Sequence, residues 1–145
     1  MEIHTIGFTQ RTAEDFFESL RAAGIRRLID TRLNNTSQLA AFAKRDDLAY
    51  FTRALLDADY RHEPLLAPTE EMLSDYRKKL IDWPSYEQRY RALLVERELE
   101  STLDKLLFDS PAALLCSEHS PEHCHRRLAV EYLAEHWDGV VAVHL

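Results

Sequence analysis

Short apolar segments rich in β-branched residues alternate along this chain with longer segments whose apolar residues recur at helical spacing. The short segments predict strands over residues 2–6, 25–30, 60–63, 112–116 and 140–145. Strands that alternate with helices favour a mostly parallel sheet joined by right-handed crossovers. We therefore predict an α/β fold of three layers, with helices on both faces of the sheet. A chain of 145 residues suits one hydrophobic core, so residues 1–145 are predicted to form a single domain.

Local signals place the predicted helices. The first begins after Thr12, which starts a Thr-x-x-Asp capping pattern, and ends at Gly24. A second begins near residues 46–47, and a third runs from residues 69–71 to about residue 81. A long amphipathic helix is predicted from Pro84 to about residue 107. A last helix is predicted with Ser120 as its N-cap and Pro121 as its first residue, because proline suits the first helical turn.

The apolar content argues for a soluble protein. Apolar residues make up 46% of the sequence, but no run approaches the roughly 18 to 20 residues that a membrane span requires. The opening MEIHTIGF has no basic segment leading into a long apolar one, so we expect a cytoplasmic location. Cytosolic reductants keep most cysteines as thiols, so a disulfide between the two cysteines would be regulatory or catalytic.

Charge and glycine content exclude several function classes. A formal net charge of -7 argues against an extended nucleic-acid surface and against an anionic membrane surface, although a local basic pocket is compatible with it. The chain has 3 glycines, and none forms the Gly-rich loop of a dinucleotide or P-loop site. The sequence therefore indicates no particular cofactor.

Polar residues follow three of the predicted strands. Ligands of open α/β sheets bind beyond the carboxyl ends of strands, and those ends share one edge when the sheet is parallel. The three segments are residues 9–11, 30–38 and 116–126, which hold the candidate ligand-binding residues Arg11, Asp30, Arg32, Asn34, Glu118 and Arg126. Asp30 and Arg32 have a structural alternative, an ion pair that fixes the loop, and we weigh it equally with binding of an anionic ligand.

The stretch LLCSEHSPEHCHRR at residues 114–127 carries the candidate chemistry. A cysteine near a helix start feels the positive end of the helix dipole, so we assign catalytic roles to Cys124, His125 and Cys116. Amides at the same helix start, with a charge-assisted fork from Arg126 or Arg127, favour a small anion. Cys116 also has a purely structural alternative, because it ends an apolar run and can be an inert buried thiol.

The same residue types suit zinc, with Cys116, His119, His123, Cys124 and His125 as possible ligands. However, a helix cannot aim the adjacent residues 123, 124 and 125 at one point, so we assign no metal ligands. A Cys116–Cys124 disulfide across the turn is geometrically open but disfavoured by the inferred compartment.

Four segments together resemble the domain-of-unknown-function family 488, DUF488. They are TIGFTQR at residues 5–11, LIDTRLNN at 28–35, LLCSEHSPEHCHRR at 114–127 and the closing VVAVHL. The resemblance implies a compact α/β domain and marks Arg11, Asp30, Arg32, Cys116, Glu118, Cys124, His125 and Arg126 as motif positions. Phe8 departs from the family, which often has histidine after the glycine, so no acid–base role is expected there.

Three functions follow from these residues. The first is an enzyme acting on a small anionic ligand, nucleotide-like or phosphorylated, through the Cys/His/Arg pocket, with a cysteine as nucleophile or redox thiol. The second is a regulatory module that binds a ligand or a nucleic-acid end in the same pocket without turnover. The third is a structural zinc protein.

Overall fold

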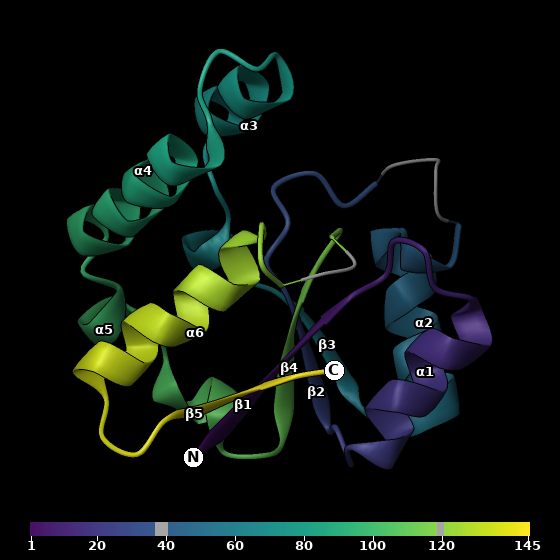
Figure 1. The fold of residues 1–145 in the computed structure, drawn as a ribbon. Coiled ribbons are helices and arrows are strands. Elements are labelled where there is room, and N and C mark those ends of the chain that lie inside the picture. The colour runs from purple at the N-terminus through teal and green to yellow at the C-terminus, as the bar shows by residue number, and fades with distance from the viewer. Residues whose placement is uncertain (37–40, 119–120) are drawn as a thin grey trace.

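The computed structural model describes residues 1–36, 41–118 and 121–145 and contains one parallel five-stranded sheet in these ranges (Figure 1). The strands are β1 (Glu2–Gly7), β2 (Arg27–Asp30), β3 (Asp59–His62), β4 (Ala112–Cys116) and β5 (Val141–His144). Their order across the sheet is β3-β2-β4-β1-β5. All four neighbouring pairs are parallel, so the predicted α/β class and mostly parallel sheet are confirmed.

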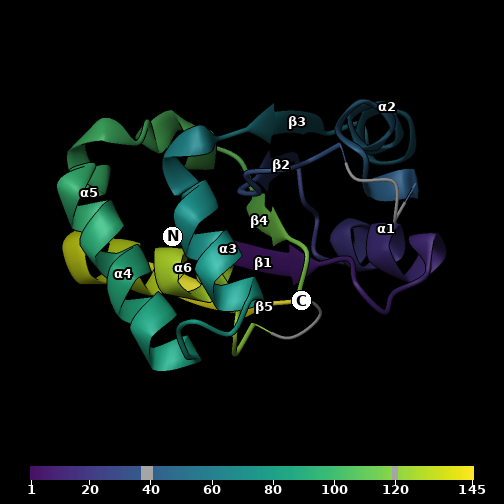
Figure 2. The ribbon, with the colours of Figure 1, turned by 90° about the horizontal axis from the view of Figure 1, so that it is seen from above.

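Helices cover both faces of this sheet, as predicted (Figures 1 and 2). They are α1 (Ala13–Ala22), α2 (Arg45–Leu56), α3 (Glu70–Arg77), α4 (Trp83–Glu96), α5 (Leu99–Thr102) and α6 (His125–His136). In the described ranges, 3-10 turns lie at Ala41–Ala43, Pro64–Leu66 and Lys105–Phe108. Helices α1 and α2 pack on one face, and α4 to α6 pack on the other (Figure 2). Within the described residues, no helix combines the length and apolar character needed to cross a membrane.

The core divides into two apolar clusters, one on each face of the sheet. Successive side chains of a strand point to opposite faces. In β4, Ala113 and Leu115 therefore join the cluster under α1 and α2. Leu114 joins the cluster under α4 to α6. A strand buried on both faces needs an unbroken apolar run, which explains the sequence of β4.

Side-chain caps begin several helices where the sequence predicts them. The Thr12 hydroxyl accepts a hydrogen bond from the Asp15 amide, and the Thr69 hydroxyl accepts one from Met72. Asp82 caps α4 in the same way, with Pro84 in the first turn. Each cap satisfies an amide that the helix leaves without a partner.

The long helix predicted from residue 84 to about 107 is wrong. Helix α4 ends at Glu96, and Glu98 takes a left-handed backbone with a φ of 51°. The chain then continues through α5 and the 3-10 turn Lys105–Phe108. This break directs Leu99, Leu103 and Leu107 into the core cluster under α4 to α6. Helix α3 likewise ends at Arg77, earlier than predicted, and Lys79 follows with a φ of 59°.

Candidate functional site

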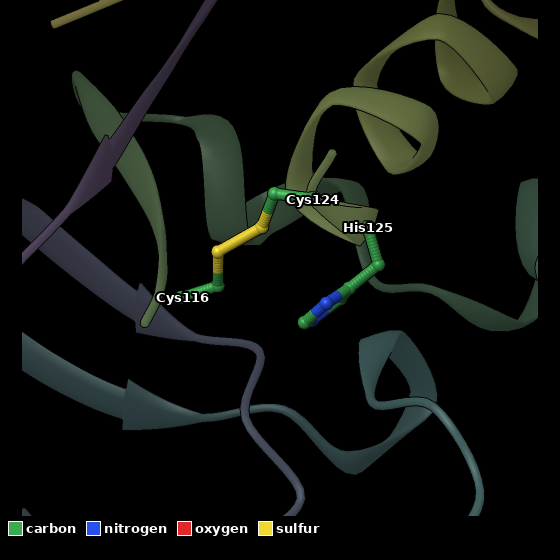
Figure 3. Close-up of side chains that lie close together, drawn as sticks. All are labelled: Cys116, Cys124 and His125. Atoms are coloured by element: carbon green, nitrogen blue, oxygen red, sulfur yellow. A yellow bond between two sulfur atoms is a disulfide. The ribbon is translucent and has the colours of Figure 1, made fainter. Parts of the chain in front are cut away.

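The candidate site lies where β4 ends and α6 begins (Figure 3). Cys116 is the last residue of β4, and His125 is the first residue of α6. The predicted helix start at Pro121 is wrong, because residues 121–123 form a turn and Cys124 occupies the N-cap with an extended backbone. The proposed N-cap Ser120 and the possible zinc ligand His119 lie outside the described residues. Cys124 therefore lies just before the helix.

A disulfide joins Cys116 to Cys124 across this turn (Figure 3). Both residues are buried, with exposed fractions of 1% and 2%. The sequence predicted free thiols from the expected compartment, and the structure corrects that prediction. The turn folds back so that the end of the strand and the start of the helix meet, which brings the two side chains together.

His125 is held by the end of β2. Its Nε2 atom lies 3.0 Å from the Thr31 carbonyl oxygen and 2.9 Å from the Thr31 hydroxyl, which itself donates to the Leu115 carbonyl. A carbonyl oxygen only accepts hydrogen bonds, so Nε2 carries the proton. Burial lowers the pKa of His125 to about 4. The ring is therefore neutral at pH 7 and keeps a lone pair on Nδ1.

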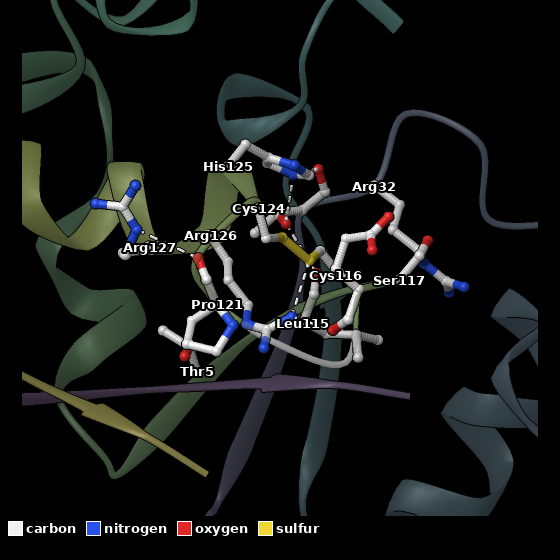
Figure 4. Close-up of a disulfide and its surroundings, with 12 residues drawn as sticks. Thr5, Arg32, Leu115, Cys116, Ser117, Pro121, Cys124, His125, Arg126 and Arg127 are labelled. Atoms are coloured by element: carbon white, nitrogen blue, oxygen red, sulfur yellow. Dashed lines mark hydrogen bonds between the residues drawn. A yellow bond between two sulfur atoms is a disulfide. The ribbon is translucent and has the colours of Figure 1, made fainter. Parts of the chain in front are cut away.

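Arg126 points its guanidinium at the sulfur of Cys116 (Figure 4). The side chain is fully buried, and its Nη1 atom lies 3.1 Å from Cys116 Sγ. The same Nη1 donates to the main-chain carbonyl of Glu118, whose side chain is exposed. Burial, and then the positive charge of Arg11, lower the pKa of Arg126 to about 10. It stays cationic at neutral pH, with Nη1 beside the sulfur of Cys116.

Gly7 makes this arrangement possible. It pairs with Cys116 in the parallel ladder between β1 and β4. A Cβ atom at this position would overlap the Glu118 carbonyl oxygen and would approach Nη1 of Arg126 to 2.5 Å. Glycine is thus required here because backbone and arginine pass too close for any side chain.

The residues predicted at the end of β2 form a closed ion pair. Arg32 donates from Nε to Asp30 Oδ1 and from Nη2 to Asp30 Oδ2, both at 2.8 Å. Nη2 also donates to the Ala43 carbonyl, and the Tyr60 hydroxyl donates to Asp30 Oδ2 at 2.5 Å. This geometry matches the structural alternative weighed in the sequence. The nearby Asn34 is exposed.

Arg11 is tied to α1 and to the end of the chain. Its Nη1 atom lies 3.0 Å from Asp15 Oδ2 and 3.3 Å from the Ser19 hydroxyl. Its Nη2 atom donates to the main-chain carbonyl of Leu145 at 2.7 Å. Arg11 thus fastens the end of the chain to α1, and binding of a ligand by this residue stays a prediction.

A hollow of about 100 Å³ opens beside the disulfide. It is lined by Leu73, Tyr76, Trp83, Tyr86, Cys116, Ser117, Glu118, His123, Cys124 and His125. The Trp83 ring stacks on His123, with centroids 5.0 Å apart, and on Tyr86 at 5.2 Å. None of the three predicted arginines belongs to this lining. The aromatic wall from α3 and α4 was missed, because in the sequence these residues fit the apolar face of a helix.

The fold and site define a parallel α/β protein with a cysteine, histidine and arginine cluster at the carboxyl edge of its sheet. Over residues 12–133 the chain matches the family model described as "Domain of unknown function DUF488". The chain therefore belongs to this family, which confirms the resemblance drawn from its motifs. No curated protein and no solved structure matches it.

Proposed function

We propose that this protein is a thiol enzyme that exchanges electrons with a small anionic disulfide through Cys116 and Cys124. The contact of 3.1 Å between Arg126 Nη1 and Cys116 Sγ carries this proposal. A buried cation against a sulfur favours its thiolate, the nucleophilic form. The first anion that Arg126 stabilises is therefore the Cys116 thiolate of the protein itself.

The reaction begins from the dithiol. The Cys116 thiolate attacks one sulfur of the ligand disulfide, the ligand's S–S bond breaks, and one ligand thiolate leaves. The Cys124 thiolate then attacks Cys116 Sγ, which releases the second ligand thiolate and forms the Cys116–Cys124 disulfide. Two electrons pass from the protein to the ligand, and the two thiol protons pass to the leaving thiolates. A cellular dithiol returns the protein to its reduced form.

The hollow supports this assignment of roles. Both cysteines line it, and most of its other lining residues carry aromatic or imidazole rings, so at about 100 Å³ it suits the part of an organic ligand next to its disulfide. Arg126 does not line the hollow, but its Nη1 lies 3.1 Å from Cys116 Sγ, so its positive charge attracts an anionic ligand through the buried site and offsets the carboxylate of Glu118 in the lining. This second effect is testable separately from the effect on the sulfur.

A trapping experiment tests the proposal. Reduced Cys124→Ser protein is mixed with glutathione disulfide, which is anionic, or with the neutral 2-hydroxyethyl disulfide, in the presence of a metal chelator. Mass spectrometry should find one ligand half on Cys116, because the serine cannot resolve the mixed disulfide. The Cys116→Ser variant should carry no such adduct at a comparable rate.

Variants of Arg126 show how much its positive charge contributes to the rate of adduct formation. Arg126→Met should slow adduct formation about tenfold or more, and Arg126→Lys should restore part of the rate. Arg127→Met is the matched control, because Arg127 contacts Glu131 and main-chain carbonyls and has no contact with the sulfurs. A faster reaction with the anionic than with the neutral disulfide supports the anionic ligand. Reaction of the folded reduced protein no faster than that of the urea-unfolded chain would overturn the proposal.

A further inference from the structure

We propose that the reduced protein binds one divalent metal ion of the zinc class through Cys116, Cys124 and His125. The two sulfurs and a ring nitrogen of His125 lie within 4.8 Å of one another, and all three residues are buried. Thiolate and neutral imidazole are the ligands that zinc and its neighbours in the first transition row prefer. The inference needs reduced sulfurs but not the exchange activity proposed above.

The objection raised by the sequence does not hold in the folded chain. A helix cannot direct adjacent side chains to one point, and both Cys124 and His125 were expected inside a helix. Cys124 instead lies at the N-cap with φ -140° and ψ 138°, so its side chain leaves the backbone in a different direction from helical positions. Both side chains then turn toward Cys116 (Figure 3). His123, whose ring stacks on Trp83, is not part of the cluster.

The environment of His125 is that of a metal ligand. Metal-bound histidines commonly donate their second ring N–H to a carboxylate or a main-chain carbonyl, which fixes the tautomer and the ring plane. His125 Nε2 does this with the Thr31 carbonyl at 3.0 Å. The remaining nitrogen, Nδ1, is then the atom that presents a lone pair for an ion.

The backbone spacing of the cysteines fits two separated thiolates. Their Cα atoms lie 7.4 Å apart. Most disulfides have Cα distances of about 4.4 to 6.8 Å. After reduction, the sulfurs therefore have room to separate around an ion without a large movement of β4 or α6.

Charge and access suggest an open coordination site. Two thiolates balance a divalent ion, and Arg126 beside Cys116 Sγ leaves one positive charge in excess. An anionic fourth ligand, such as hydroxide or a carboxylate or thiolate of a substrate, would neutralise it. The hollow beside the sulfurs offers the approach, and three protein ligands with one exchangeable position are typical of catalytic zinc sites.

Metal binding and the disulfide exclude each other. A dithiol reductant breaks the Cys116–Cys124 bond by supplying two electrons, and the ion then displaces the two thiol protons. A disulfide oxidant takes the two electrons back, re-forms the bond and releases the ion. The metal content of the protein therefore follows its redox state.

Cobalt is the spectroscopic probe for this inference. Protein is reduced, freed of reductant under anaerobic conditions, titrated with Co²⁺ and then challenged with Zn²⁺. We expect one equivalent per reduced chain, with a thiolate-to-cobalt charge-transfer band that Zn²⁺ removes. Oxidised protein should bind none. Equal binding by the oxidised protein, or no charge-transfer band after reduction, would overturn the inference.

Variants locate the ion. Cys116→Ser and Cys124→Ser should each weaken the band and the affinity, and His125→Gln should shift the spectrum. His123→Gln is the matched control and should change neither. Thr31→Val keeps all three ligands and the Thr31 carbonyl that accepts from Nε2, and it removes only the hydroxyl at 2.9 Å, so its affinity should fall by less than the tenfold to about 100-fold loss seen when a supporting contact is removed outright. Circular dichroism shows whether each variant folds, and a full-strength site in folded Cys116→Ser would also refute the assignment.

The two proposals fail in different ways. The trapping experiment contains a chelator, so an adduct on Cys116 is independent of metal. Loss of the cobalt site with normal trapping refutes the metal inference alone. Normal cobalt binding with no trapping refutes the exchange function alone.

Discussion

The carboxyl ends of β2 and β4 lie side by side in the sheet, and each holds a buried arginine near its end. At the end of β2, Arg32 forms a bidentate pair with Asp30, in which two hydrogen bonds join the guanidinium to the carboxylate. At the end of β4, Arg126 meets the sulfur of Cys116 and a main-chain carbonyl. The first arrangement fixes the loop, and the second leaves a cation to act on a sulfur whose charge changes with its redox state.

The two strand ends also differ in the aromatic and imidazole groups beside them. The Tyr60 hydroxyl donates to the Asp30 carboxylate and accepts from the side-chain amide of Asn35. On the other side, His125 lies next to the sulfurs as a neutral ring with one nitrogen held by Thr31. The end of β2 is thus an ion pair whose hydrogen bonds are satisfied within the protein. At the end of β4, the neutral ring of His125 keeps a lone pair close to the two sulfurs.

The largest effect is expected when the pair at the end of β2 is broken. Asp30→Asn keeps the shape of the side chain but leaves the Arg32 charge buried without its partner. Loss of one partner of a buried pair costs about 3 to 5 kcal/mol of unfolding free energy. Urea denaturation of wild type and variant measures the difference.

The control for Asp30→Asn is Glu18→Gln, which removes an exposed pair with Arg21. Such pairs contribute less than about 1 kcal/mol, so this variant should unfold close to wild type. Equal stability of Asp30→Asn and Glu18→Gln would show that the end of β2 is not held by its ion pair, and the contrast with β4 would fail.

The second effect is a loss of stability at acid pH that comes from the β4 side. His125 has a pKa of about 4 in the folded chain, against 6.5 in its ordinary state, because burial disfavours the charged ring. The unfolded chain therefore binds the proton more readily between these values. The contribution of His125 is fully present above pH 6.5 and is lost as the pH falls toward 4, by about 3 kcal/mol in total.

Denaturation of the oxidised protein at several pH values, with a chelator present, checks this prediction. The profile of His125→Gln is subtracted from that of wild type, which removes the contribution of all other titrating groups. The difference should decrease between pH 6.5 and 4 and stay constant from pH 7 to 8. Parallel profiles would mean that His125 is not buried as a neutral ring.

The fold was largely readable from the sequence because its signals are local. Capping threonines at residues 12 and 69, the apolar run of β4 and the alternation of elements all act within a few residues along the chain. The prediction of one long helix from residue 84 to about 107 was wrong for a nonlocal reason. The break at Glu98 serves the packing of Leu99 and Leu103 in the core, and the amphipathic pattern continues through it.

The candidate site was predictable in its residue types but not in its contacts. Strand order puts β2 beside β4, which brings Thr31 to His125 across 94 positions of the sequence. Sequence spacing contains no signal for that neighbour. Gly7 directly follows the strand predicted over residues 2–6, but its close approach to Glu118 and Arg126 depends on the pairing of β1 with β4.

The smallest loss of stability is expected at the end of β2, when one hydrogen bond to the Asp30 carboxylate is removed. Tyr60→Phe removes the hydroxyl that donates to Asp30 Oδ2 at 2.5 Å and leaves Arg32 in place. A hydrogen bond to a charged group contributes about 1.5 to 3 kcal/mol, and the partial burial of Tyr60 favours the lower end, so urea denaturation should show a loss of about 1 to 2 kcal/mol. The rate of adduct formation on Cys116 should not change, because Tyr60 does not line the hollow beside the sulfurs. A slower reaction at Cys116 would show that the two strand ends are coupled, and the division between a structural end and a reactive end would then have to be abandoned.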